Sequence, residues 1–227
     1  MKKELLHLRH IYKQRGFENV LRGIDLRIYA DEVLFLLGRD SSGKTTLVEL
    51  LAGIIQPDRG GIFRDCHQLR FKGLHEANSQ GIHYICERSA LFDNLSIGEN
   101  ICLKNPVKLS LGNYIDRTES IAGILCSEFG VKVDMTVLVR DAGLGPYERV
   151  FLEAIRAAYQ RADLIIFDNI LWQLSPTEII KITKLVQKMK ERHITVVFCA
   201  ASQCEALSMA DRVVFLQHGA IAADYTR

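Results

Sequence analysis

The sequence predicts an α/β fold in which a parallel β-sheet is covered by helices, and three observations lead to this prediction. Apolar runs of strand length recur along the chain, and toward its C-terminus they alternate with a helical pattern. A glycine-rich loop at residues 38–46 joins one such run to a helix. A helical stretch at residues 91–159 separates the strand-like runs into two groups, which indicates a helical block inserted into the sheet-forming chain.

The N-terminal part of the chain is rich in strand-like runs. Residues 5–12 and 20–29 form the first two, and a short turn leads into a third at residues 33–37. Residues 54–64 contain a Pro-Asp-Arg-Gly-Gly cluster, which predicts turns. A further strand is expected at residues 82–86.

Residues 38–46 match the phosphate-binding pattern G-x-x-x-x-G-K-[ST] at every fixed position. A strand pattern precedes the loop and a helical pattern follows it, which is the context that supports this motif. The alternative is a glycine-containing turn that Lys-Thr follows by chance, and such a turn would not require a strand before it and a helix after it. Backbone N–H groups of such a loop surround phosphate oxygens, and the helix N-terminus adds partial positive charge. Lys44 is expected to reach the β- and γ-phosphates, and Thr45 to ligate Mg²⁺. The candidate nucleotide-binding residues of the loop are Gly38, Arg39, Asp40, Ser41, Ser42, Gly43, Lys44, Thr45 and Thr46.

The remaining elements follow in order. Residues 116–129 and 146–158 are the clearest helices of the inserted block, and strand-like runs return at residues 164–167, 194–198 and 213–216.

A helix with clear start signals follows the first of these runs. Ser175 can cap it, Pro176 suits its first position, and Glu178 completes a capping box. Its buried stripe is expected to consist of Ile179, Ile182, Val186 and Met189.

Asp168 ends the strand-like run at residues 164–167. Phosphate-loop enzymes place an aspartate at the end of such a strand to hold the Mg²⁺ that the loop threonine also ligates. Many strands end in Asp, so the pattern gains its weight from the intact phosphate loop earlier in the chain. It predicts that Asp168 and Thr45 share a magnesium ion.

The composition limits the classes of partner. The 227 residues carry a formal net charge of +2, which argues against nucleic acid as a partner. The densest basic group, at residues 181–192, is interpreted as the solvated face of a helix. No C-x-x-C pair occurs, and Cys86 and Cys199 are expected to be small core residues, which suits reduced thiols in the cytosol. Neither a signal peptide nor a membrane span is expected.

Five segments together resemble the ATP-binding cassette of ABC transporters, over essentially the full length of the chain. They are residues 20–26, 51–61, 81–88, 91–101 and 211–219. The first is similar to the cassette's opening strands, the third and fourth to the loop that links its core to its helical part, and the last to its closing strand and turn. Several of these segments are similar to the corresponding segments in the cassettes of bacterial simple-sugar importers.

This resemblance implies a P-loop NTPase core with a parallel sheet, an N-terminal antiparallel β subdomain and an inserted α-helical subdomain. It implies one cassette domain over residues 1–227, with a nucleotide-binding core at about 1–88 and 160–227 and a helical subdomain at about 89–159. The implied cofactors are ATP and Mg²⁺.

The resemblance also implies partners. They are a transmembrane permease subunit, a second ATP-binding cassette in a homo- or heterodimer and, indirectly, a solute-binding protein. The implied location is cytoplasmic, on the inner face of the cell membrane. Whether a second cassette follows in a longer tandem protein stays open, as do the transported substrate and the direction of transport.

Two positions that the family uses for hydrolysis differ in this chain. In the cassettes a Glu directly after the magnesium Asp polarises the attacking water, and here that position is Asn169. An amide cannot accept a proton at neutral pH, and loss of a general base typically costs about 10²–10⁴-fold in rate. The family's His that contacts the γ-phosphate corresponds to Ala201, whose methyl group cannot form a hydrogen bond.

The family's Leu-Ser-Gly-Gly-Gln signature corresponds to residues 142–146, where only the second glycine, Gly145, is retained. Gly143 replaces the Ser that reaches the partner's γ-phosphate. Pro146 replaces the Gln and removes a backbone donor, although Pro suits the start of a helix.

Two further positions carry over with changes. The adenine-stacking aromatic of the family corresponds to Arg15, which Tyr12 and Phe17 flank, and a guanidinium can itself stack on a ring. Glu87 stands where many cassettes have Gln, and its oxygen is a candidate ligand for the metal.

Two functions remain open from the sequence. The first is an ATP-binding subunit of a sugar importer that binds Mg-ATP but hydrolyses it weakly. The alternative is an ordinary ABC-type transport ATPase that hydrolyses ATP to drive sugar uptake, with the missing groups supplied by a partner or by other residues. A small-molecule phosphoryl transferase is disfavoured, because the inserted block resembles a cassette's helical subdomain rather than an Arg-rich lid.

The segment at residues 87–101 resembles the part of a cassette that receives the permease. Phe92 and Leu95 are expected to be partly exposed there. The alternative, that both side chains belong to the core, stays open.

Overall fold

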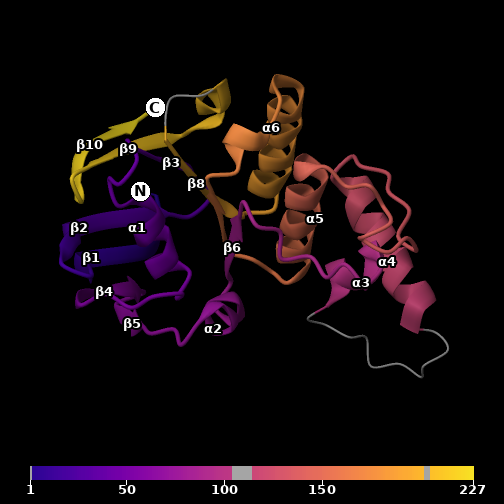
Figure 1. Ribbon diagram of the computed structural model, residues 1–227, viewed down its shortest axis with the longest axis horizontal. Coiled ribbons are helices and arrows are strands. Elements are labelled where there is room, and N and C mark those ends of the chain that lie inside the picture. The colour runs from indigo at the N-terminus through magenta and orange to yellow at the C-terminus, as the bar shows by residue number, and fades with distance from the viewer. Residues whose placement is uncertain (1, 104–113, 202–204) are drawn as a thin grey trace.

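The computed structural model describes residues 2–103, 114–201 and 205–227, and these form two β-sheets flanked by helices (Figure 1). The strands of the first sheet are β1 (Glu4–Arg15), β2 (Glu18–Tyr29), β4 (Arg59–Arg64) and β5 (His67–Leu69). They pair antiparallel in the order β2-β1-β4-β5.

The second sheet is central to the molecule. Its strands are β3 (Val33–Leu37), β6 (Ile82–Cys86), β7 (Leu164–Asp168), β8 (Thr195–Ala200), β9 (Arg212–Gln217) and β10 (Ala220–Thr226). They lie in the order β10-β9-β3-β8-β7-β6, parallel except for the antiparallel β10. The carboxyl ends of β3, β7 and β8 therefore meet at one edge of the sheet, which positions the site described below.

Helices cover both faces of the central sheet. They are α1 (Lys44–Leu51), α2 (Leu74–Ser79), α3 (Ile97–Cys102), α4 (Tyr114–Glu128), α5 (Pro146–Tyr159) and α6 (Pro176–Glu191), with short 3-10 helices at Leu171–Gln173 and Glu205–Met209. One apolar core joins the first sheet, α1 and one face of the central sheet. The other joins the opposite face to α3, α4, α5 and α6, with α3 and α4 lying farthest from the sheet (Figure 1).

The start of α6 confirms the expected capping box. The Ser175 hydroxyl accepts from the Glu178 N–H at 3.4 Å, and the Glu178 carboxylate accepts from the Ser175 N–H at 2.8 Å. The predicted stripe is buried at Ile182, Val186 and Met189 and half-buried at Ile179, and the prediction missed the buried Leu185.

Some expectations need correction. Residues 54–64 are not only turns, because β4 occupies their second half. It forms a hairpin with β5 through Asp65 and Cys66, which both adopt positive φ. Cys199 is buried as expected, but Cys86 is only half-buried, since it lies at the end of β6. The strand β10 and the short α2 were not predicted.

In the described part of the chain, no helix is both long and apolar enough to cross a membrane.

Candidate functional site

Close backbone packing shapes the loop between β3 and α1. A Cβ atom on Gly38 would clash with the Leu216 carbonyl oxygen of β9. Gly43 has a φ of 100°, and a Cβ atom there would lie 2.7 Å from Leu21 Cδ2. Only glycine fits either position without strain. The two fixed glycines of the sequence pattern therefore have separate structural causes, one a close approach and the other a left-handed backbone.

Lys44 begins α1 and is buried within the loop. Its ammonium donates to the carbonyl oxygens of Gly38 at 2.6 Å and Arg39 at 2.8 Å, so the side chain folds back across the loop that it follows. This places a cation against the N-terminus of an eight-residue helix. The loop thus concentrates positive potential from the helix dipole and from Lys44 at one point, which favours an anion.

A cavity of about 230 Å³ opens beside the loop. Its lining residues are Val20, Asp40, Ser41, Ser42, Gly43, Lys44, Thr45, Thr46, Asp168, Asn169, Cys199 and Ala201. Seven of the nine predicted loop residues are thereby brought together with three candidates that end or directly follow β7 and β8 and lie far from the loop in the sequence. The cavity can hold phosphate groups against the loop and a cation against the carboxylate.

Asp168 ends β7 as a buried carboxylate with unequal oxygens. Oδ2 accepts a hydrogen bond from the Tyr84 hydroxyl at 2.7 Å, whereas Oδ1 is buried and has no hydrogen-bond partner among the described residues. Burial, together with the nearby Asp168 carboxylate, raises the pKa values of the Tyr84 phenol and the Cys199 thiol, so both stay protonated. Asp168, with its unpartnered oxygen, and Thr45 both line the cavity and offer oxygen donors of the kind that Mg²⁺ prefers, so these residues fit the implied cation.

Asn169 and Ala201 line the same cavity. Asn169 has a φ of 54° and its backbone N–H donates to the Cys199 carbonyl at 2.9 Å, a conformation that Asn tolerates better than most residues. The side chains of Asn169 and Ala201 are exposed to the cavity side of the sheet edge. Among the described residues that line this cavity there is no histidine, and the acidic ones are Asp40 and Asp168.

Four predicted site residues do not line this cavity. Gly38 and Arg39 line the larger cavity described below, and Arg15 and Glu87 lie elsewhere. Arg15 forms an ion pair with Glu49 of α1, and the neighbouring Phe17 is fully exposed in the turn between β1 and β2. Glu87 is exposed and lines a separate cavity of about 350 Å³ between the end of β6 and α5, together with Pro146. The structure therefore does not bring Arg15 or Glu87 together with the loop and Asp168.

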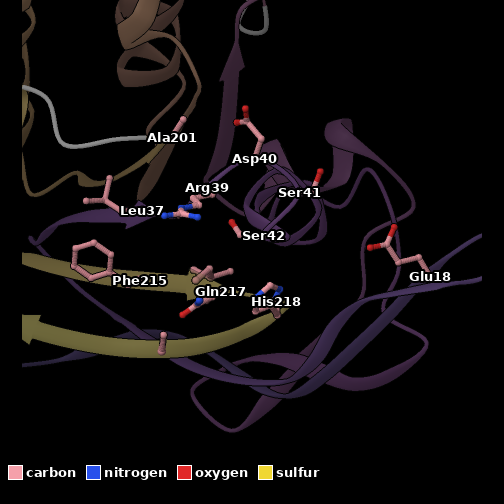
Figure 2. A pocket seen from close by; sticks show the side chains of 13 residues that line it. Glu18, Leu37, Arg39, Asp40, Ser41, Ser42, Ala201, Phe215, Gln217 and His218 are labelled. Carbon is pink, nitrogen blue, oxygen red and sulfur yellow. The ribbon is translucent and has the colours of Figure 1, made fainter.

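A larger cavity of about 620 Å³ lies on the side of the loop that faces β9 and β10 (Figure 2). Figure 2 shows the Arg39 side chain between Leu37 and Ser42, with Phe215 and Gln217 of β9 near it. The sequence did not predict this cavity, because its walls come from strands paired across the sheet. The residues that line both cavities are Asp40, Ser41, Ser42 and Ala201.

Two further residues, one that contacts Asp168 and one that lines the cavity of Glu87, are not predicted from the sequence. Tyr84 is one, and the other is Glu153 of α5, whose Oε1 accepts from the Ser89 hydroxyl at 2.8 Å and the Ala90 N–H at 2.9 Å. These bonds fix the segment after Glu87 to α5. Nothing in the sequence distinguishes either residue from ordinary strand or helix residues, because the signal is the contact itself.

The segments expected to meet partner proteins are also placed. Gly145 precedes α5 without a capping side chain, and Pro146 takes the first helical position, as predicted. Phe92 is 56% exposed and Leu95 is half-buried, which matches the expected partial exposure. Phe92 lines a groove of about 470 Å³ together with the exposed Leu74 and Leu103.

Comparisons with known proteins agree with this arrangement. The family model described as "ABC transporter" matches residues 21–171. The ribose import ATP-binding protein RbsA of Clostridium tetani is 31% identical over 96% of the chain and 45% of its own length. A ribose import ATP-binding protein of Rubrobacter xylanophilus is 31% identical over 95% of the chain and 43% of its own length. The chain thus spans about half the length of the curated relatives that it matches.

Solved structures give the same fold. The crystal structure of a nucleotide-free ATP-binding cassette from an ABC transporter superposes with a TM-score of 0.83 at 18% identity, over 98% of this chain and 91% of the other.

Proposed function

The chain belongs to the ABC transporter family, and from that premise we propose that it is an ATP-binding subunit of a sugar importer that binds Mg-ATP and hydrolyses it weakly. The sugar class is proposed from the ribose import relatives. The observation that carries the proposal is the cavity in which the phosphate loop, Lys44 and Asp168 meet.

The residues of this cavity have distinct proposed roles. The loop N–H groups and Lys44 bind the phosphates, while Thr45 and Asp168 hold the cation. When bound, Mg²⁺ neutralises the phosphate oxygens and orients them. Arg15 and Glu87 contribute to adenine and metal only if nucleotide binding moves them, since both lie outside the cavity.

Weak hydrolysis is proposed from what the same cavity lacks. Asn169 offers no general base for the attacking water, and Ala201 offers no contact for the γ-phosphate. If the chain is instead an ordinary transport ATPase, another group must supply the base. The closest described acidic candidates in the cavity are Asp40, on the loop, and Asp168, which the cation needs.

The proposed partners follow from the family. We infer that a second cassette covers the phosphate loop, that a permease subunit docks near Phe92 and Leu95, and that the assembly lies at the inner face of the cell membrane. The permease in turn connects the chain to a solute-binding protein. The division into a core and a helical subdomain at residues 89–159 is part of the same proposal.

A thermal-shift titration with Mg-ATP tests the binding function. A ligand that binds only the folded state stabilises it by RT ln(1 + [L]/Kd), or about 2.7 kcal/mol at a hundredfold excess over Kd. The melting temperature should rise with Mg-ATP in the parent and not in Lys44→Ala. Lys184→Ala, which removes an exposed lysine from α6, should keep the shift. No shift in the folded parent would refute ATP binding.

A further inference from the structure

One contact behind the candidate cation site connects it to the edge of the sheet. Tyr84 lies on β6, which pairs with β7 so that Tyr84 stands opposite Ile166 and Cys86 opposite Asp168. The Tyr84 hydroxyl lies 2.7 Å from Asp168 Oδ2 and donates to it, because an ionised carboxylate can only accept. Tyr84 thus reaches Asp168 from the neighbouring strand, two positions along the register.

This hydrogen bond makes the two oxygens of Asp168 different. Oδ2 is held by the phenol, whereas the buried Oδ1 has no partner among the described residues. Asp168 is only 5% exposed and lines the cavity with Lys44 and Thr45. A buried polar atom without a partner costs free energy, so the free oxygen points to a ligand that supplies positive charge.

We propose that Tyr84 is a positioning residue for the divalent cation that accompanies the bound nucleotide. The proposal rests on the proposed function. The phenol fixes the rotation of the Asp168 carboxylate, so that Oδ1 stays available to the cation. Partners of this kind behind a ligand typically change metal affinity by about 10–100-fold when they are removed.

A purely structural role for Tyr84 predicts a different result. The Tyr84 ring packs against the apolar core between the two sheets, so its loss would also disturb packing. Tyr84→Phe keeps the ring and deletes only the hydroxyl. A packing role therefore leaves the cation dependence of nucleotide binding unchanged, whereas a positioning role reduces it.

The test measures the equilibrium affinity of the full chain for ATP, once in EDTA and once in saturating Mn²⁺. The parent should bind ATP more tightly with Mn²⁺, and Tyr84→Phe should lose about tenfold of that enhancement while its affinity in EDTA is unchanged. Tyr147→Phe is the matched control, because it removes a hydroxyl from a buried tyrosine on a different element, α5, and should keep the full enhancement.

A double variant separates the contact from a general effect. Once Asp168→Asn has removed the carboxylate, adding Tyr84→Phe should cause no further change in the affinity with Mn²⁺. This comparison also tests the proposal if Tyr84→Phe alone does not fold. In the double variant the Asp168 carboxylate and the Tyr84 hydroxyl are removed together, so no carboxylate is left without its hydrogen-bond donor. A further loss in the double variant would overturn the proposal.

The outcomes distinguish this inference from the function on which it rests. If the folded parent binds ATP in neither condition, the proposed function fails. If the parent shows the Mn²⁺ enhancement and Tyr84→Phe retains all of it, the function stands and the positioning role of Tyr84 is wrong.

Discussion

At the scale of single residues, the phosphate loop depends on where its backbone runs. The Gly38 Cα faces the Leu216 carbonyl and the Ser42 hydroxyl so closely that no side chain fits between them. We expect Gly38→Ala to lower the free energy of unfolding by about 1–3 kcal/mol, the usual cost of overpacking, and to weaken ATP binding because the loop must move. Urea unfolding and the thermal shift with Mg-ATP measure the two effects.

Gly123→Ala is the matched control for this substitution. Gly123 lies inside α4, where a Cβ atom would make only an ordinary contact with Met135, 3.9 Å away. Alanine in a helix interior stabilises by about 0.5–1 kcal/mol relative to glycine. Equal effects of the two substitutions would show that the close approach at Gly38 does not constrain the loop.

The proposed weakness of hydrolysis rests on two residues of the cavity, Asn169 and Ala201. Groups that act as a unit are non-additive, so Asn169→Glu or Ala201→His alone should do little. Glutamate at position 169 also meets a φ of 54°, which costs about 1 kcal/mol or more for a residue with a bulky side chain. The double variant, combined with a partner cassette that has a working signature, should release phosphate much faster than either single variant. A phosphate-release assay measures this difference.

The opposite outcome is equally clear. Robust phosphate release by the unmodified chain alone, abolished by Lys44→Ala, would show that Asn169 and Ala201 do not limit hydrolysis. The chain would then be an ordinary transport ATPase, and another residue would have to be found as the base.

At the scale of elements, the sequence predicts those whose pattern is strong. The apolar run of β3 and the capping box of α6 are local signals, and both were located within a residue or two. The strand β4 lacks such a signal, because two glycines and two arginines interrupt its apolar pattern. The strand β10 was missed because it is an exposed edge, with little apolar alternation beyond Ile221. Both β4 and β10 are strands because they pair with neighbouring strands, and this pairing leaves no clear pattern in their own sequences.

In the candidate site, the meeting of the loop and Asp168 follows from the sequence, whereas individual side-chain contacts do not. Parallel strands bring their carboxyl ends to one edge, so a motif after β3 and a carboxylate at the end of β7 are expected to meet there. Tyr84 and Glu153 could not be predicted, because their roles depend on which neighbour each side chain reaches. Arg15 and Glu87 were carried over from the family, and neither lies in the cavity.

Glu153 gives the contact between α5 and the segment after β6 a pH dependence. Burial raises the pKa of Glu153 above its ordinary 4.5, and the hydrogen bonds from Ser89 and Ala90 offset only part of this effect. The folded state therefore keeps the proton to a higher pH than the unfolded chain does. The free energy of unfolding should fall as the pH rises from about 4.5 through the folded-state pKa of Glu153.

Glu153→Gln tests this linkage. Both hydrogen bonds go to Oε1, which the amide retains as an acceptor, while the titrating proton is lost. In urea unfolding between about pH 4 and pH 8, the stability of the variant relative to the parent should rise with pH and then level off. Glu191→Gln, on the exposed end of α6, is the comparison. A constant difference across this range would show that Glu153 does not titrate differently in the folded state.

At the scale of the whole molecule, the central sheet separates two apolar cores. The strand β6 lies at the edge of this sheet and contributes side chains to both cores. The groove that contains Phe92 runs along β6, between α2 and α5. Tyr84, on the same strand, contacts Asp168. A partner seated in this groove would thus touch the strand that reaches the candidate cation site.

The last prediction concerns the proposed docking segment for a permease subunit. Phe92, at 56% exposure, and the half-buried Leu95 flank one turn before α3, where an apolar partner surface would bury them. Phe92→Asp with Leu95→Asp should reduce co-purification of the permease subunit by tenfold or more, since burying two unpaired carboxylates costs several kcal/mol. Ile180→Asp, at a 59% exposed position on α6, controls for added charge and should leave co-purification unchanged. If the folded Phe92–Leu95 double variant retains the permease, this segment is not the docking surface, and the exposure of Phe92 needs another explanation.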